Sequence, residues 1–179
     1  MTRTLSLVAG VLLLATTALG NTLQLEVDLS DRELHAYVEG ELVRSYDVSV
    51  GTKEKPTPEG EFSIRKLVFN PDWRPPNEKW AKGKTYKAPG DPENPMKVVK
   101  MFFRDPDYYI HGTDDHDSLG DARSHGCIRM KQSDVKELSK MVMEHGGKPM
   151  PEPWYRRIFR RKTMQVVYLA EKVPIAVRE

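Results

Sequence analysis

Apolar and polar residues alternate along much of this chain, and a period of two is typical of β-strands with one buried face. Residues 23–29 begin the pattern, with leucine or valine at every second position. Residues 34–38 and 42–50 predict a hairpin that turns at Glu39-Gly40. Further strands are expected over residues 62–69, 96–103, 108–111 and 163–170. The excess of strands over helices favours a mostly β fold of the α+β class.

One principal helix is expected after residue 132. Val135, Leu138 and Val142 recur at helical spacing and fall on one face, while Gly146-Gly147 supplies an end signal. Ser133 is the expected N-cap, because its hydroxyl can accept a hydrogen bond from an unpaired amide of the first turn. We expect the apolar face to pack behind the strand that precedes the helix.

Residues 70–95 contain too many prolines and glycines for regular structure and predict a long loop. Its tryptophans, Trp73 and Trp80, have two interpretations. They could fasten the loop to the core, or the loop could form a lid over a cleft, since long ordered loops are often functional. Residues 114–123 are polar and contain glycine, which predicts a second, mobile loop.

The N-terminal residues predict a targeting segment. Arg3 gives a positive start, an apolar run follows over residues 5–15, and Ala18-Leu19-Gly20 has the small residues of a cleavage site. A membrane anchor is the alternative, but the run falls short of the ~20 apolar residues of a spanning helix. We therefore expect a signal peptide over residues 1–20, export to the periplasm or cell envelope, and a single mature domain over residues 21–179.

Composition narrows the choice of partners. Lys and Arg number 28 against 26 Asp and Glu, a net charge of +2 that falls to +1 when Arg3 is removed, so no nucleic-acid partner is expected. The five histidines lack the spacing of a zinc site, and no glycine-rich phosphate loop is present. We expect neither a metal nor a cofactor, and we expect a monomer.

The candidate chemistry gathers at residues 124–130, which read Ser-His-Gly-Cys-Ile-Arg-Met. Cys127 is the only cysteine of the chain, so it forms no intramolecular disulfide. His111 lies upstream, at the end of an apolar, strand-like run. A thiol and an imidazole that folding brings together are the minimum equipment for nucleophilic acyl transfer. A buried structural cysteine is the alternative, but the His-Gly pair in both motifs favours the catalytic interpretation.

If residues 127–130 are extended, their side chains alternate between two faces. Cys127 and Arg129 would then face a cleft, while Ile128 and Met130 would face the core. A guanidinium beside the thiol favours the thiolate over the neutral form, whose ordinary pKa is about 8.5. Arg129 is also suited to grip a substrate carboxylate through two parallel hydrogen bonds.

His111-Gly112-Thr113 and residues 124–130 closely resemble the signature of the YkuD-type L,D-transpeptidase family, in the branch that reads Cys-Ile-Arg. The resemblance covers about residues 22–145. It is also carried by Val50-Gly51-Thr52 and by residues 57–62, 70–76 and 89–96. It implies a fold of two packed β-sheets with one principal helix.

The resemblance also implies peptidoglycan stem peptides as substrates. Cys127 would attack the carbonyl of the third residue of a tetrapeptide stem and release the terminal D-alanine. His111 would take the thiol proton or stabilise the thiolate. An amine of a second stem would then attack the thioester and form a 3→3 cross-link.

Several neighbours would support this pair of residues. In the family the imidazole is oriented by the backbone carbonyl of the following residue, here Gly112. Backbone amides around Gly126 and Cys127 would hold the developing oxyanion. Ser124 and His125 are expected to shape the turn rather than to move protons.

Three alternatives stay open. Another acceptor, namely a lipoprotein lysine, a free D-amino acid, or water as in an L,D-carboxypeptidase, would change the product and leave the acyl-enzyme half unchanged. A papain-like protease would use the same chemistry, but Cys127 lacks the neighbours expected of one. A non-catalytic wall-binding module is the third, and the intact pair of Cys127 and His111 argues against it.

Residues 154–162 form a basic amphipathic segment that the resemblance does not explain. Trp154, Tyr155, Ile158 and Phe159 recur at helical spacing between Arg156, Arg157, Arg160 and Arg161. One interpretation is a short helix that packs its aromatic side chains on the core and exposes a solvated basic face. The other is an anchor for an anionic membrane or wall surface, held by charge and by partly inserted aromatic side chains.

Overall fold

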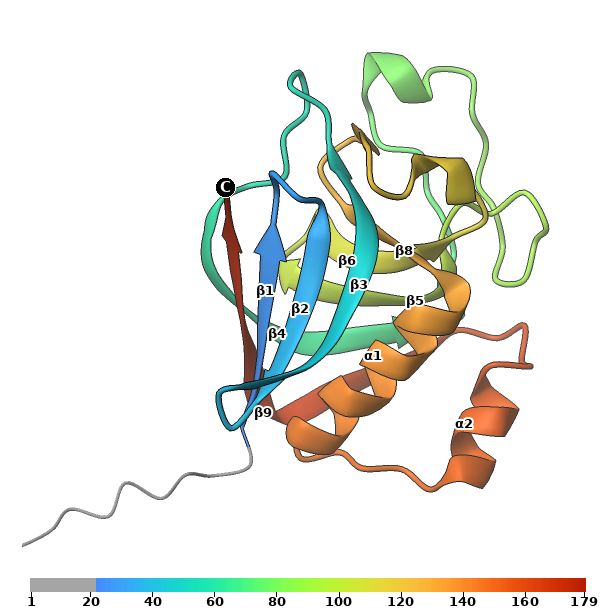
Figure 1. The fold of residues 1–179 in the computed structure, drawn as a ribbon. Coiled ribbons are helices and arrows are strands. Elements are labelled where there is room, and N and C mark those ends of the chain that lie inside the picture. Colours follow the sequence, from blue (N-terminus) through green and yellow to red (C-terminus); the bar gives the residue numbers. More distant parts are fainter. Residues whose placement is uncertain (1–21) are drawn as a thin grey trace, which may run out of the picture.

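The computed structural model describes residues 22–179, and most of its regular structure is β-strand (Figure 1). The strands are β1 Leu23–Asp28, β2 Glu33–Val38, β3 Glu41–Gly51, β4 Gly60–Phe69, β5 Lys97–Arg104, β6 Tyr108–Thr113, β7 Ala122–Ser124, β8 Ile128–Lys131 and β9 Gln165–Arg178. The helices are α1 Gln132–His145 and α2 Glu152–Ile158, with 3-10 turns η1 Lys79–Ala81 and η2 His116–Ser118. The mostly β fold is therefore confirmed. The signal peptide expected over residues 1–20 lies outside the described residues.

Eight strands of the described chain close into a ring. Their order is β2-β1-β9-β4-β5-β6-β8-β3, and β3 pairs back onto β2. The long strand β3 changes partners along its length, from β2 at its start to β8 near its end. The ring is thereby folded into two layers whose strands run in different directions, with β1 and β2 in one and β5, β6 and β8 in the other (Figure 1). The two packed sheets expected from the family are two parts of one continuous hydrogen-bonded network.

The alternation of apolar and polar residues explains the core between the layers. Leu23, Leu25 and Val27 of β1 are at most 2% exposed, and Ile64 and Leu67 of β4 are fully buried. Burial of such a side chain contributes roughly 1.5–3 kcal/mol relative to an exposed position, because apolar surface leaves water. One cluster of buried side chains joins both layers and both helices.

Helix α1 packs Val135, Leu138 and Val142 into this core, as their spacing predicts. The predicted N-cap is wrong. β8 runs directly into the helix at Gln132, so Ser133 already lies within the first turn, where its hydroxyl donates to the carboxylate of Asp134 at 2.7 Å. The predicted end is confirmed, since the helix stops at His145 and Gly147 follows with a φ of 69°.

Two other boundaries differ from expectation. The basic segment is helical over Glu152–Ile158 rather than over residues 154–162, because Pro151 and Pro153 suit the start of a helix. The last strand continues past residue 170 to Arg178, through Pro174, a residue that central strands usually exclude. No helix within residues 22–179 has the length and apolar character needed to cross a membrane.

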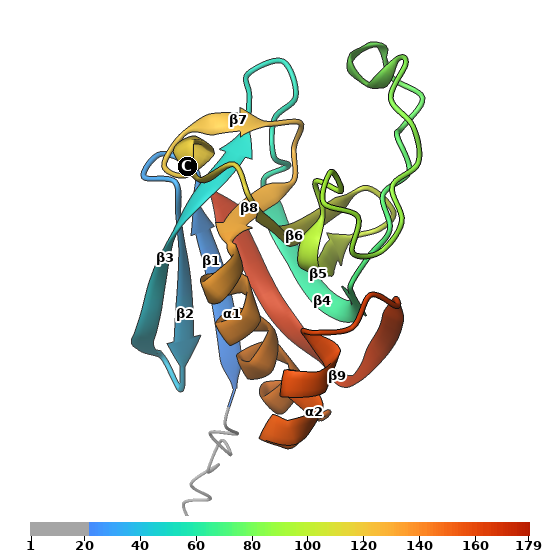
Figure 2. The ribbon, with the colours of Figure 1, turned by 90° about the vertical axis from the view of Figure 1, so that its right-hand side faces the viewer.

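The 70–95 loop is the largest irregular segment between two strands of the described chain. Figure 2 shows it standing beside β5 and β6, away from α1. Trp73 is 6% exposed and exchanges backbone hydrogen bonds of 2.9 Å with Lys87, so the loop is held together by its own backbone as well as by packing.

Candidate active site

The strand that follows Cys127 alternates between core and cleft. Ile128 and Met130 are fully buried, whereas Cys127 and Arg129 line a cleft of about 1140 Å³. The parallel register of β6 and β8 places His111 directly beside Arg129. The predicted division of this strand into core-facing and cleft-facing residues is confirmed.

The cleft lies between the outer face of β5, β6 and β8 and the 70–95 loop. Its lining includes His111, Ser124 and His125 together with Cys127 and Arg129. The structure therefore brings five of the seven predicted site residues to one cavity, while Gly112 and Gly126 do not line it. No group of His, Cys, Asp or Glu side chains within residues 22–179 is arranged to hold a metal ion.

His111 is 2% exposed, and its Nδ1 lies 2.8 Å from the carbonyl oxygen of Gly112. A carbonyl oxygen only accepts, so Nδ1 carries the proton of the neutral ring and Nε2 is the acceptor nitrogen. Burial lowers the pKa of His111 to about 3, helped by the charges of Arg129 and Lys100 and opposed by the hydrogen bond to Gly112. The imidazole is therefore neutral near pH 7 and able to take a proton.

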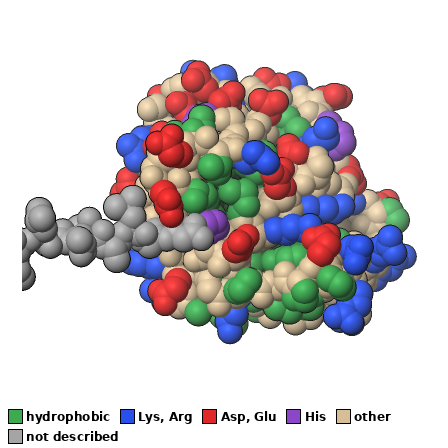
Figure 3. Space-filling view, turned by 60° about the horizontal axis from the view of Figure 1, so that its bottom comes forward, with side chains coloured by type: hydrophobic (Ala, Val, Ile, Leu, Met, Phe, Trp, Pro, Cys, Tyr) green, Lys and Arg blue, Asp and Glu red, His purple; other side chains and the backbone are tan. Residues whose placement is uncertain are grey.

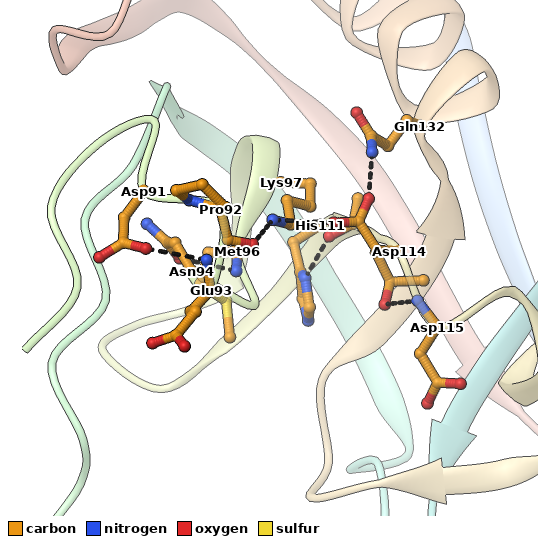
Figure 4. A network of polar contacts seen from close by, with 12 residues as sticks. Asp91, Pro92, Glu93, Asn94, Met96, Lys97, His111, Asp114, Asp115 and Gln132 are labelled. Atoms are coloured by element: carbon orange, nitrogen blue, oxygen red, sulfur yellow. Dashed lines mark hydrogen bonds and ion pairs between the residues drawn. The ribbon is translucent and has the colours of Figure 1, made fainter. Parts of the chain in front are cut away.

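A polar network holds the strand end that carries Gly112 (Figure 4). Asp114 forms an ion pair with Lys97 at 2.8 Å and accepts a hydrogen bond from Gln132. Lys97 also donates to the carbonyl of Pro92 at 2.7 Å. These contacts join the end of β6 to α1 on one side and to the 70–95 loop on the other, which fixes the carbonyl that orients the imidazole.

The Cys127 thiol is half-buried and donates to the carbonyl of Asp107 at 3.3 Å. Burial raises the pKa of the thiol, while hydrogen bonds with Tyr109 and the charges of Lys100 and Arg129 act in the opposite direction. Arg129 thus favours the thiolate as expected, but burial outweighs it. Near pH 7 the cleft thus holds a neutral thiol and a neutral imidazole.

Ser124 holds the turn before Cys127. Its hydroxyl donates to the Cys127 carbonyl at 2.5 Å and accepts the Gly126 N–H at 3.0 Å. Gly126 has a φ of 107°, and a Cβ there would lie 2.8 Å from the Tyr108 ring, so only glycine fits. This geometry agrees with a turn-shaping Ser124. Because the Gly126 N–H is already donated, its use toward an oxyanion would require this hydrogen bond to break.

His125 contacts the 70–95 loop. Its ring stacks on Trp80 with centroids 3.9 Å apart, and Lys84 Nζ lies 4.9 Å from the centroid of the Trp80 ring. The two tryptophans therefore fit different interpretations. Buried Trp73 fastens the loop, whereas Trp80 covers the turn beside Cys127, as a lid would.

The cleft residues that sequence reasoning does not predict include Lys100, Tyr109 and Asp115. Tyr109 lies two positions before His111, so strand alternation alone is enough to place it on the cleft face. Lys100 faces the cleft through the pairing of β5 with β6, which contains a bulge that the sequence does not reveal. Asp115 forms an ion pair with Arg129 at 3.3 Å. It belongs to the 114–123 loop, which composition predicts to be mobile.

The aromatic side of α2 faces the core. Phe69 lies 5.4 Å from Trp154 and 6.0 Å from Phe159 between ring centroids, and Tyr155 and Ile158 are buried. This arrangement is the packing interpretation of the basic segment. The aromatic side chains that an anchor would insert into a membrane are packed against the core instead. All four arginines are exposed, namely Arg156, Arg157, Arg160 and Arg161.

Comparison with known proteins identifies the family. The sequence model of the YkuD family, described as the L,D-transpeptidase catalytic domain, matches residues 23–168. A putative L,D-transpeptidase YkuD of Bacillus licheniformis is 34% identical over 119 residues, 66% of this chain and 59% of that protein. A putative L,D-transpeptidase YqjB of Bacillus subtilis is 31% identical over 121 residues, 65% of this chain and 64% of that protein. The chain thus matches about three fifths of the length of these relatives.

Solved structures share the fold. An L,D-transpeptidase from Mycobacterium smegmatis has a TM-score of 0.57 and 20% identity, over 89% of this chain and 60% of that one. The catalytic domain of the Enterococcus faecium L,D-transpeptidase has a TM-score of 0.56 and 21% identity, over 89% of this chain and 98% of that one. These identities bear on the fold alone, and the predicted fold is confirmed. On the match over residues 23–168, the chain belongs to the family of L,D-transpeptidase catalytic domains.

Proposed function

We propose that this chain is a cysteine-dependent L,D-transpeptidase of peptidoglycan, with Cys127 as the nucleophile and His111 as its base. The observation that carries the proposal is a thiol and a neutral imidazole in one cleft, with the imidazole Nδ1 fixed by the Gly112 carbonyl. That hydrogen bond leaves Nε2 to accept a proton, which is the state a general base requires.

The first half of the reaction is an acyl transfer to sulfur. Nε2 of His111 takes the thiol proton as Sγ of Cys127 attacks the carbonyl carbon of the third stem residue. The C–N bond to the terminal D-alanine then breaks, and the imidazolium returns the proton to the departing amine. A thioester on Cys127 and free D-alanine result. The backbone amide of Cys127 stabilises the oxyanion, at about 3 kcal/mol per donor, and the Gly126 amide joins it only if its hydrogen bond to the Ser124 hydroxyl breaks.

The second half transfers the acyl group to an acceptor. An amine of a neighbouring stem attacks the thioester, loses a proton to His111 and releases the thiol, which forms a 3→3 cross-link. A lipoprotein lysine, a free D-amino acid or water would follow the same route to a different product. Arg129 lines the cleft and can hold a carboxylate of either substrate.

The direct test incubates the protein with a disaccharide-tetrapeptide and determines the masses of the products. Release of D-alanine together with a cross-linked dimer is expected, and loss of D-alanine without a dimer would point to water as the acceptor. Cys127→Ala should abolish release, and Cys127→Ser should leave little, because a hydroxyl is a far weaker nucleophile than a thiolate. Full release by Cys127→Ala would overturn the proposal.

Labelling by a β-lactam separates an enzyme from a non-catalytic wall-binding module. One solved L,D-transpeptidase, enzyme 3 of Mycobacterium tuberculosis, is described with a faropenem-derived adduct. We expect faropenem to add one adduct mass to this protein and none to Cys127→Ala. An unlabelled wild-type protein that binds cell-wall sacculi would favour the binding module.

We further propose export to the periplasm or cell envelope after removal of residues 1–20. The N-terminal residue of the protein recovered from the envelope should be Asn21.

We also retain an electrostatic role for the basic segment, because none of its four arginines forms an ion pair within residues 22–179. Figure 3, which views the molecule from the side of α2, shows Lys and Arg side chains gathered at one edge of that face.

A further inference from the structure

Lys100 brings into the cleft a positive charge that the reaction described above does not use. Its Nζ donates to the carbonyl of Asp72 at 3.1 Å and lies 4.9 Å from the centroid of the Tyr109 ring. The Asp72 carboxylate pairs with Arg74 at 3.2 Å, and Lys100 forms no ion pair within residues 22–179. Burial lowers the pKa of Lys100 below its ordinary value, and the charge of the Asp72 carboxylate opposes this effect only in part.

Strand register places this cation next to the base. Lys100 of β5 pairs with His111 of β6, and His111 pairs with Arg129 of β8. Residues paired across neighbouring strands point to the same face, with Cα atoms about 4.5–5.5 Å apart. The imidazole is therefore flanked by one cation on each side, both on the cleft face of the sheet.

The two flanking cations differ in their partners. Arg129 Nη1 lies 3.3 Å from the carboxylate of Asp115, so part of its charge is already compensated. Among residues 22–179, Lys100 contacts a backbone carbonyl and the face of an aromatic ring, and the nearby Asp72 carboxylate is itself paired with Arg74. Of the two cations, Lys100 is therefore the one for which a substrate carboxylate would supply the missing ion-pair partner.

The proposed reaction supplies a carboxylate at this place. The departing nitrogen of D-alanine must lie beside His111 to receive its proton, and the carboxylate of D-alanine is only two bonds away from that nitrogen. A group so close to the imidazole falls beside one of its two flanking residues. We propose that Lys100 binds the terminal carboxylate of the D-alanine leaving group, and this assignment rests on the proposed transpeptidase function.

The consequence is selection of stems that end directly after the fourth residue. A hydrogen-bonded ion pair with the carboxylate holds the scissile amide against Cys127 and His111. A stem whose terminal carboxylate is replaced by an amide, or is joined to a fifth residue, cannot form this ion pair with Lys100. Loss of a hydrogen bond to a charged group lowers binding or kcat/KM by roughly 10–100-fold, and we expect a difference of this size between the two kinds of stem.

The test measures kcat/KM for two substrates, a disaccharide-tetrapeptide that ends in D-alanine and the same molecule that ends in D-alanine amide. For the wild-type protein we expect a value about 10–100-fold lower with the amide. Lys100→Met, which keeps the length of the side chain and removes the charge, should lower turnover of the carboxylate substrate to the level of the amide. Lys100→Arg should restore part of the difference.

Lys66→Met is the matched control. Lys66 lies on the neighbouring strand β4, pairs with Asp105 at 2.9 Å and does not line the cleft, so its removal should leave the substrate ratio unchanged. A wild-type protein that turns over both substrates equally would overturn the assignment without any variant, as would a Lys100→Met protein that keeps the wild-type ratio. Failure to release D-alanine from the first substrate and D-alanine amide from the second would instead overturn the proposed function itself.

Discussion

The indole of Trp80 lies almost flat on the imidazole of His125, with ring centroids 3.9 Å apart and ring planes 17° from parallel. One ring belongs to the 70–95 loop, and the other belongs to the turn that presents Cys127. The contact links the two, so an outward movement of the loop at Trp80 must separate the rings. An aromatic pair of this kind contributes about 0.5–1.5 kcal/mol beyond the burial of its area.

Substitution of Trp80 should therefore affect turnover more than stability. We expect Trp80→Ala to lower kcat/KM for the disaccharide-tetrapeptide by up to about tenfold, since the turn beside Cys127 loses its cover. Trp80→Phe should retain most activity because a ring remains to stack on His125. Trp73→Ala is the contrast, and it should lower Tm because Trp73 is buried. If Trp80→Ala has the kinetics of the wild-type protein, the lid interpretation of Trp80 is wrong, and both tryptophans only fasten the loop.

The buried, neutral His111 should make folding stability depend on pH. Its pKa in the folded protein is about 3, below the unfolded value of about 6.5, so between these values the unfolded chain binds one more proton. The free energy of unfolding then falls as pH falls, by about 1.4 kcal/mol per pH unit. Between pH 6.5 and 5 this amounts to about 2 kcal/mol.

Comparison with His111→Gln isolates that contribution. Urea unfolding at pH 7 and pH 5 should show the wild-type protein losing about 2 kcal/mol more than the variant, whose amide does not titrate. The other titratable groups are common to both proteins, so the difference reports on position 111. Equal losses would mean that the imidazole is not held neutral in the fold.

Arg129→Lys tests the guanidinium of the cleft. The variant keeps the positive charge and loses the planar fork, so turnover should fall by about tenfold or more while Tm stays nearly unchanged. Asp115 is its only ion-pair partner within residues 22–179, and that pair is partly exposed, which limits the effect on stability. A large loss of Tm with normal turnover of the folded fraction would make Arg129 a structural residue.

The basic segment can be tested by changing Arg156, Arg157, Arg160 and Arg161 to Gln. Hydrolysis or transfer with small soluble substrates should be unaffected, because α2 keeps its packed aromatic face. Binding to sacculi or to anionic vesicles at low salt should weaken, and it should lose most of its salt dependence, since exposed charges are screened within about 10 Å at 0.1 M. Equal co-sedimentation of wild-type protein and variant would leave α2 with a packing role only.

The sequence is sufficient to predict which way a side chain faces where this depends on the alternation along a single strand. The period of two after Cys127 depends only on the extended backbone, and it correctly divided Cys127 and Arg129 from Ile128 and Met130. The same rule, applied backward from His111, reaches Tyr109. The motifs around Cys127 and His111 were readable for the same reason, since each is a short continuous stretch.

Relationships between strands were beyond those rules. Lys100 stands beside His111 because two residues are accommodated in a bulge after Lys97, where Val98 has a φ of 69°. Nothing local in the sequence sets that register. The 114–123 loop was expected to be mobile on composition, yet Ser118 within it is fully buried and its hydroxyl donates to the Asp115 carbonyl at 2.6 Å.

The pairing of β1 with β9 has a consequence for the order in which the protein is assembled. Leu25, near the start of the described chain, lies beside Ile175 near its end, and β9 also pairs with β4. A chain that emerges N-terminus first can form the β2–β3 hairpin early, but it cannot close the ring until its final strand arrives. The cleft that holds Cys127 and His111 is thus supported by a closed ring only after β9 has been made, so a chain that stops short of β9 carries both residues without the fold that positions them.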